Sequence, residues 1–116
     1  MIIVNKTILN EKKRNENMIK VYKEELEKLP KGTIVKKQIN NKEYYYLYYR
    51  QEKKVISKYL GSNIDTVSEI EEKINRRKQI ENILKKLNEE KGKLSKMEEL
   101  LWLYIMEVIW LLIIQN

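Results

Sequence analysis

The spacing of apolar residues predicts a helix at the start of the chain. Over residues 19–29 the apolar side chains recur at steps of three and four, which places them on one face of a helix. Pro30 and Gly32 end this pattern, because proline cannot continue a helix and glycine weakens it. The sequence therefore predicts a first helix over residues 7–29.

The next stretch has the composition of β-strands. Thr33–Ile39, Glu43–Arg50 and Lys53–Leu60 are rich in Val, Ile and Tyr, and five tyrosines fall in the second of these segments. Asn40-Asn41 and Gln51-Glu52 separate the segments as two-residue turns, since Asn tolerates positive φ. We expect a three-stranded antiparallel meander.

A long helix is predicted over residues 65–91. Thr66 and Glu69 have the spacing of a capping box, and Asp65 or Ser68 are rival caps. At about 1.5 Å per residue the helix is roughly 40 Å long, which exceeds what a three-stranded sheet covers. Its second half should pack on the first helix, on the tail or on a second copy. The heptad match is too short and irregular to indicate a coiled coil by itself.

The last segment, residues 97–116, is predicted as a separate apolar helical tail that follows a single domain over residues 1–96. Gly92 should weaken the helix before it, and Leu100–Ile114 contains one charge, Glu107. Three alternatives stay open: burial in a bundle of copies, a short membrane anchor, or a tail translated from a shifted frame. For self-association, most simply as a homodimer, the candidate residues are Leu100, Leu101, Tyr104, Val108, Leu111 and Leu112. The fold class is α+β.

Composition argues against catalysis. The chain has no Cys and no His, which removes disulfides, thiol chemistry and histidine acid–base catalysis, and no metal site or cofactor is expected. Its three glycines are isolated and match no phosphate-binding loop. We expect no enzyme. The apolar start is too short for a signal peptide, so the cytoplasm is the expected location.

Positive charge is concentrated in the sheet region. Residues 31–61 have eight basic and two acidic side chains, which gives +6 of the total +7, and they include six of the eight tyrosines. A localised basic field attracts phosphates, anionic lipid or an acidic protein. The run Arg76-Arg77-Lys78 is more typical of a solvated helix face than of a phosphate site.

Strand alternation sorts these residues by face. The more aliphatic face should meet the helices, and the other face combines tyrosines with basic residues. Tyrosine rings stack on unpaired bases, and Lys or Arg contact phosphates or base edges. The alternative is that helices cover both faces and the tyrosines are core. The candidate nucleic-acid-binding residues are Lys37, Tyr44, Tyr46, Tyr48, Arg50, Lys53 and Tyr59.

Four short motifs carry a resemblance: residues 29–34 (Leu-Pro-Lys-Gly-Thr-Ile), 44–47 (Tyr-Tyr-Tyr-Leu), 49–50 (Tyr-Arg) and 58–61 (Lys-Tyr-Leu-Gly). Over residues 18–92 the chain resembles a family of short uncharacterised bacterial and archaeal proteins, a domain of unknown function. The resemblance implies a fold and no activity. The basic meander followed by a helix is also similar in pattern to the arm-type DNA-binding domain of phage integrases.

Two functions from different classes follow. The first is a small non-enzymatic nucleic-acid-binding accessory protein of a phage or mobile element, for DNA or RNA. The second is a protein–protein interaction module, either an oligomeric adaptor or a phage-encoded inhibitor of a host defence complex such as an anti-CRISPR. A membrane-tethered adaptor is a third reading. Salt dependence separates the first two, since phosphate contacts weaken steeply with salt.

Overall fold

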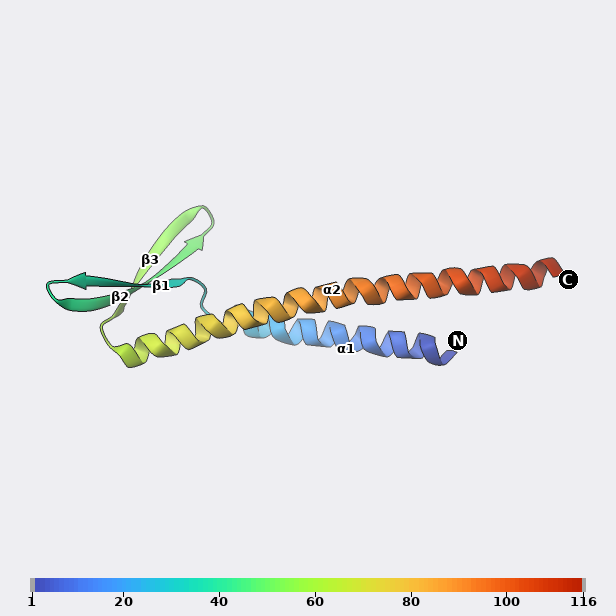
Figure 1. Cartoon of the computed structure of the whole chain (residues 1–116), viewed down its shortest axis with the longest axis horizontal. Coiled ribbons are helices and arrows are strands. Elements are labelled where there is room, and N and C mark those ends of the chain that lie inside the picture. Colours follow the sequence, from blue (N-terminus) through green and yellow to red (C-terminus); the bar gives the residue numbers. More distant parts are fainter. Residues whose placement is uncertain (1, 116) are drawn as a thin grey trace. The chain divides into compact units, whose positions relative to one another are not determined.

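The computed structural model describes residues 2–115, with side chains from residue 5 onward. The elements follow the order α1 (Ile2–Glu27), β1 (Thr33–Ile39), β2 (Lys42–Gln51), β3 (Lys54–Gly61) and α2 (Ile64–Gln115) (Figure 1). The fold is α+β, with a helix, a three-stranded antiparallel sheet and a long helix, as the sequence predicts.

The C-terminal end of α1 is stabilised by a side chain of α2. Leu29 N–H donates to the carbonyl of Leu26 at 3.2 Å, a tightened turn that precedes Pro30. The Arg77 guanidinium donates through Nη1 to the carbonyls of Leu26 and Leu29, at 2.9 and 2.8 Å. Arg77 therefore acts as a cationic cap at the negative end of the helix dipole.

The β1–β2 turn agrees with the sequence, and the β2–β3 turn does not. Asn40 and Asn41 have φ of 51° and 66°, the two positive values of a type I′ hairpin turn. The second turn consists of Glu52 and Lys53, one residue later than expected, with φ of 60° at Glu52. Lys53 is therefore a turn residue and not the first residue of β3. The later turn lengthens β2 to include Gln51, which pairs with Lys54.

The N-terminus of α2 also differs from the expected capping box. Asn63 is the N-cap: its Oδ1 accepts a hydrogen bond from the Asp65 N–H at 3.0 Å, and its carbonyl accepts from the Val67 N–H at 3.2 Å. Asparagine is among the strongest N-caps because its side-chain oxygen satisfies an unpaired N–H of the first turn. The helix therefore begins at Ile64, ahead of the expected Thr66–Glu69 box.

The expected separation of an apolar tail helix is absent, because α2 continues through Gly92 to Gln115. A glycine in a helix interior costs about 0.5–1 kcal/mol relative to alanine. A break would instead leave the N–H and C=O groups of two helix ends without intrahelical partners. Leu87 and Leu94, on either side of Gly92, are buried, and their packing favours the continuous helix.

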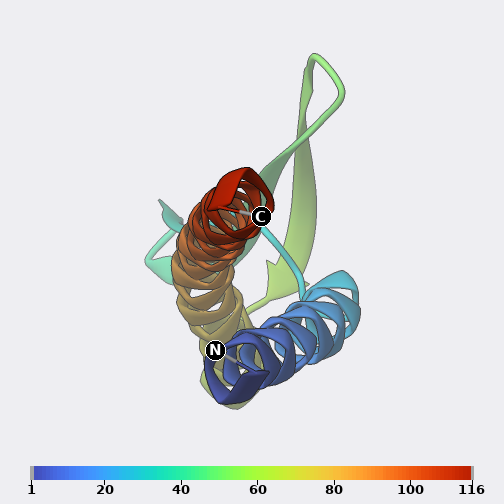
Figure 2. The same cartoon turned by 90° about the vertical axis from the view of Figure 1, so that its right-hand side faces the viewer.

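The described residues form two compact units. One is residues 24–82, which contain the sheet and the adjoining ends of α1 and α2, with Leu47, Val67, Ile74 and Ile80 as buried side chains. The other comprises the rest of α1 and α2, which run antiparallel side by side (Figures 1 and 2). Its buried apolar residues are Ile8, Ile19, Leu84, Leu87 and Leu94.

Candidate nucleic-acid interface

The register of the sheet places the even-numbered tyrosines of β2 on one face. Tyr46 lies opposite Val35 on β1 and opposite Tyr59 on β3, and Tyr44 lies opposite Lys37. Because side chains alternate along a strand, Tyr44, Tyr46 and Tyr48 share one face with these partners. We call this surface the tyrosine face and define it by Lys37, Lys42, Tyr44, Tyr46, Tyr48, Arg50 and Tyr59.

The displaced β2–β3 turn moves the pairing of β3 along β2 without exchanging the faces. Tyr46 is opposite Tyr59, whereas a Gln51-Glu52 turn would put Ser57 there. The displacement is two residues, the period of side-chain alternation, so each residue stays on its expected face. A bulge follows, since the partner of Tyr45 is Gly61 and Leu60 is the extra residue.

Three rings of the tyrosine face form an edge-packed cluster. The Tyr46 and Tyr59 ring centroids are 5.3 Å apart with planes at 71°, and those of Tyr44 and Tyr59 are 6.2 Å apart at 57°. Both geometries are favourable for aromatic pairs. Tyr44 and Tyr46 are half-buried, and Tyr59 is 50% exposed. The cluster is thus ordered by its own contacts while part of its ring surface remains open.

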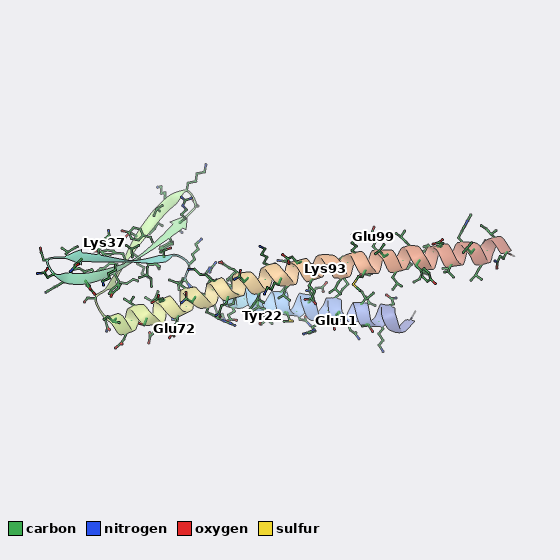
Figure 3. The ribbon with its side chains drawn as sticks, viewed as in Figure 1. Glu11, Tyr22, Lys37, Glu72, Lys93 and Glu99 are labelled. Atoms are coloured by element: carbon green, nitrogen blue, oxygen red, sulfur yellow. The ribbon has the colours of Figure 1, made fainter. Side chains whose placement is uncertain are left out.

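Lys37 is labelled on the sheet in Figure 3, and its ammonium lies over two rings of the tyrosine face. Its Nζ is 4.8 Å from the Tyr46 ring centroid and 5.4 Å from that of Tyr48. Hydrogen bonding to the Tyr48 hydroxyl raises the pKa of Lys37 above its usual value. The same interaction, assisted by a hydrogen bond to Ser57, lowers the pKa of Tyr48. The ammonium is therefore held in place and fully charged at neutral pH.

The other cations of the tyrosine face lie toward its two ends. Lys42 begins β2 and is exposed, and Arg50 is exposed opposite Val55. In the part of the chain that the structure describes, neither they nor Lys37 form an ion pair with a carboxylate. Lys42 was not among the residues expected from the sequence, although it precedes Tyr44 by two and alternation alone assigns it to this face.

The opposite face of the sheet is the one that meets helical residues. Leu47 is buried there, and a hollow of about 450 Å³ beside it is lined by residues that include Leu29, Pro30 and Arg77. Lys36, on this face, is neutralised by Glu43, with Nζ 2.8 Å from Oε1, and this contact raises the pKa of Lys36. The helices of this unit thus meet the more aliphatic face, as expected, and do not bury the tyrosine face.

The expected site residues are brought together with one exception. Lys37, Tyr44, Tyr46, Tyr48, Arg50 and Tyr59 share the tyrosine face, whereas Lys53 lies in the β2–β3 turn. The run at residues 76–78 is not simply solvated surface. Arg77 caps α1, and Arg76 forms a two-point contact with Glu25, at 2.8 and 3.2 Å, that lowers the pKa of Glu25.

A sequence family matches the part of the chain that contains the sheet. A family model described as Domain of unknown function (DUF6788) matches residues 9–72, from α1 through the sheet to the first turns of α2. The chain belongs to this family of uncharacterised domains. No curated protein and no solved structure matches the chain. The match ends at residue 72, whereas α2 continues to Gln115. The family match therefore says nothing about the last turns of α2.

The apolar end of α2 also bears on the membrane alternative. Among residues 2–115, no helix contains a stretch that is both long enough and apolar enough to cross a membrane.

Proposed function

We propose that this protein binds nucleic acid through the tyrosine face and that it has no catalytic role. The observation that supports the proposal is one face of a sheet on which four tyrosines accompany three cations that form no ion pair with a carboxylate among the described residues. No acidic strand residue shares this face, because Glu43 lies on the other one. The face therefore presents positive charge and aromatic surface together.

The chemistry favours unpaired bases over a duplex. A partly open tyrosine ring offers its π-face to a base, and such stacking contributes about 1–3 kcal/mol per base. Lys42 and Arg50 are eight residues apart on β2, a distance of about 27 Å at roughly 3.4 Å per residue. Phosphates of a strand laid along β2 meet these cations at the ends and Lys37 near the middle.

The test compares two lysines on opposite faces of the sheet. Lys37→Ala removes a cation of the tyrosine face, and Lys58→Ala removes an exposed cation opposite Leu47. Binding of a labelled 12-nucleotide single strand, and of the matching duplex, is measured by fluorescence anisotropy over a salt series. We expect Lys37→Ala to weaken binding and to lower the slope of log affinity against log salt by about one, with Lys58→Ala close to wild type.

Two outcomes contradict the proposal. One is the absence of binding at low salt by a protein whose circular dichroism shows it to be folded. The other is an equal loss in both variants, which indicates a diffuse attraction to net positive charge. Stronger binding of the duplex retains the tyrosine face as the site and changes its ligand to double-stranded nucleic acid.

Tyr46 and Tyr45 provide a second matched pair. They are adjacent in β2, both are half-buried, and they point to opposite faces. Tyr46→Leu should lower single-strand affinity by about 1–3 kcal/mol through the loss of one stacked base, and Tyr45→Leu should not. If Tyr46→Leu and Tyr45→Leu have the same thermal stability and lower the affinity equally, stacking on the tyrosine face does not contribute to binding.

A further inference from the structure

The face of the sheet opposite the tyrosine face borders a hollow of about 450 Å³, a volume within the range of small-molecule clefts. All of its lining residues belong to the unit of residues 24–82. Each of the four short motifs of the sequence, at residues 29–34, 44–47, 49–50 and 58–61, contributes at least one of them. The proposed function uses these motifs only on the tyrosine face, so it does not explain why they also meet here.

The walls of the hollow are fixed by contacts within the chain. Arg77 Nη1 donates to two backbone carbonyls where α1 ends, which holds the link between α1 and β1 in place. Gly32, in the same link, approaches β2 so closely that a Cβ there would lie 3.0 Å from Leu47 Cδ1 and 3.1 Å from Tyr49 Cβ. The hollow is therefore formed in advance, and a preformed site loses little free energy to ordering when a ligand enters it.

One part of the lining is apolar. Leu47 is buried and Tyr49 is half-buried, and alternation places both on the same face of β2. Leu29 and Pro30, both half-buried, line the hollow from the link between α1 and β1. An aliphatic or aromatic group bound here is removed from water and contacts carbon atoms of these side chains.

The rest of the lining carries net positive charge. Lys31 and Lys58 are exposed, and neither forms an ion pair with a carboxylate among the described residues. Arg77 Nε donates to Glu81 at 3.2 Å, and Arg77 Nη2 has no hydrogen-bond partner in the described part of the chain. Glu27 is the one carboxylate of the lining. The local charge stays positive when both acids are counted.

We propose that this hollow binds a small amphipathic carboxylate, a molecule in which one carboxylate is joined to an aliphatic or aromatic body. The body packs on the apolar part of the lining, and the carboxylate accepts charge-assisted hydrogen bonds from the lysines and from Arg77 Nη2. Because Glu27 also lines the hollow, a single negative charge is favoured over the higher charge of a phosphate monoester. The site is separate from the tyrosine face and does not depend on the function proposed for it.

Three probes that share one body and differ in charge test this chemistry on the full chain by fluorine NMR. They are the anion para-trifluoromethyl-phenylacetate, its neutral amide, and the cation para-trifluoromethyl-phenethylamine. We expect a Kd of about 1 mM for the carboxylate, binding about tenfold weaker for the amide, and weaker binding still for the amine. Equal affinity for the carboxylate and the amide, or no binding of the carboxylate at about 10 mM, overturns the proposal.

Variants with opposite effects on charge locate the carboxylate. Lys58→Ala removes a lining cation and should weaken binding of the carboxylate probe about threefold, whereas Glu27→Gln removes the lining acid and should strengthen it about twofold. Lys54→Ala is the matched control, because Lys54 is exposed on the same face of β3 and lies outside the lining. Equal effects of the two lysine variants, or weaker binding by Glu27→Gln, overturn the proposal.

Signals of the protein report where the carboxylate probe binds. The methyl signals of Leu29 and Leu47 and the ring signals of Tyr49 should shift, because these side chains line the hollow. The ring signals of Tyr46 and Tyr48 should not shift, and a result in which they alone respond contradicts the site. The probe titrations contain no nucleic acid, so their failure leaves the proposed function of the tyrosine face unaffected.

Discussion

The side-chain amide of Asn15 donates a hydrogen bond to the backbone carbonyl of Leu87, 2.9 Å away, and both residues are buried between α1 and α2. The other polar atom of the amide, Oδ1, is buried without a hydrogen-bond partner among the described residues. A buried polar residue between two packed helices can fix their register at a cost in stability. The hydrogen bond from Asn15 to Leu87 therefore favours one alignment of α1 along α2.

Replacing Asn15 should stabilise the fold. We expect Asn15→Leu to raise the free energy of unfolding by about 1–3 kcal/mol, because the desolvation penalty of the unpaired oxygen disappears. Chemical denaturation measures the change. Asn17→Leu, the same substitution at an exposed position of α1, should stay within about 0.5 kcal/mol of wild type. A lower stability of Asn15→Leu would show that the hydrogen bond to Leu87 outweighs the penalty.

The faces of the sheet were predictable from sequence, although the second turn was not. Alternation assigns a face by parity, and the displacement of the turn to Glu52-Lys53 is accompanied by a two-residue shift in pairing, which preserves parity. The turn itself was missed because Glu52 takes a positive φ that its residue type does not favour. As a consequence, Lys53 lies in the turn and not on the tyrosine face, where the sequence had placed it.

The packing of α1 on α2 was not predictable from apolar spacing alone. The contacts between the two helices include Lys12 and Asn15 on α1 and Glu98 on α2, and such polar residues interrupt the apolar pattern by which packed helix faces are detected. Their partners are distant in sequence: Lys12 pairs with Glu98. Gly92 was predicted to weaken the helix because glycine has a low helix propensity. The packing of Leu87 and Leu94 that favours a continuous helix involves residues distant in sequence, so local sequence does not reveal it.

The Lys37–Tyr48 contact predicts a distinct pH dependence. The pKa of Tyr48 is lowered in the folded protein, so the stability that its ionised form contributes is present above the unfolded value of about 10 and is lost as the pH falls through the folded pKa. The Lys37 contribution has the opposite sign: it is present below about 10.5 and is lost as the pH rises through the raised pKa.

The absorbance of ionised tyrosine measures the pKa of Tyr48 directly. In an alkaline titration, ionisation of the Tyr48 phenol should contribute an early phase to the absorbance change, because the pKa of Tyr48 is lowered. Lys37→Met should remove this early phase, and Lys36→Met, on the opposite face, should keep it. An unchanged curve for Lys37→Met would show that the contact does not lower the pKa of Tyr48.

Gly32 and Gly92 should respond in opposite directions to alanine. A Cβ at Gly32 would lie 2.5 Å from the carbonyl oxygen of Tyr48, and φ there is +133°, so Gly32→Ala should destabilise the sheet. Apart from its chain neighbours and the backbone of its own helix turn, a Cβ at Gly92 meets no described atom within 4 Å, and the residue is in a helix interior. Gly92→Ala should therefore stabilise the protein by about 0.5–1 kcal/mol. Thermal unfolding compares the two variants with wild type. A stabilised Gly32→Ala protein would contradict the close approach of Gly32 to the Tyr48 carbonyl on β2.

The central claim is that nucleic acid contacts one face of the sheet, and tyrosine ring resonances test it most directly. Isotope-labelled protein is titrated with a single-stranded 12-nucleotide oligonucleotide and followed by NMR. The account predicts that the ring signals of Tyr44, Tyr46, Tyr48 and Tyr59 shift together, while those of Tyr45 and Tyr49 on the opposite face do not. Shifts that are equal on both faces, or confined to Tyr45 and Tyr49, would contradict it.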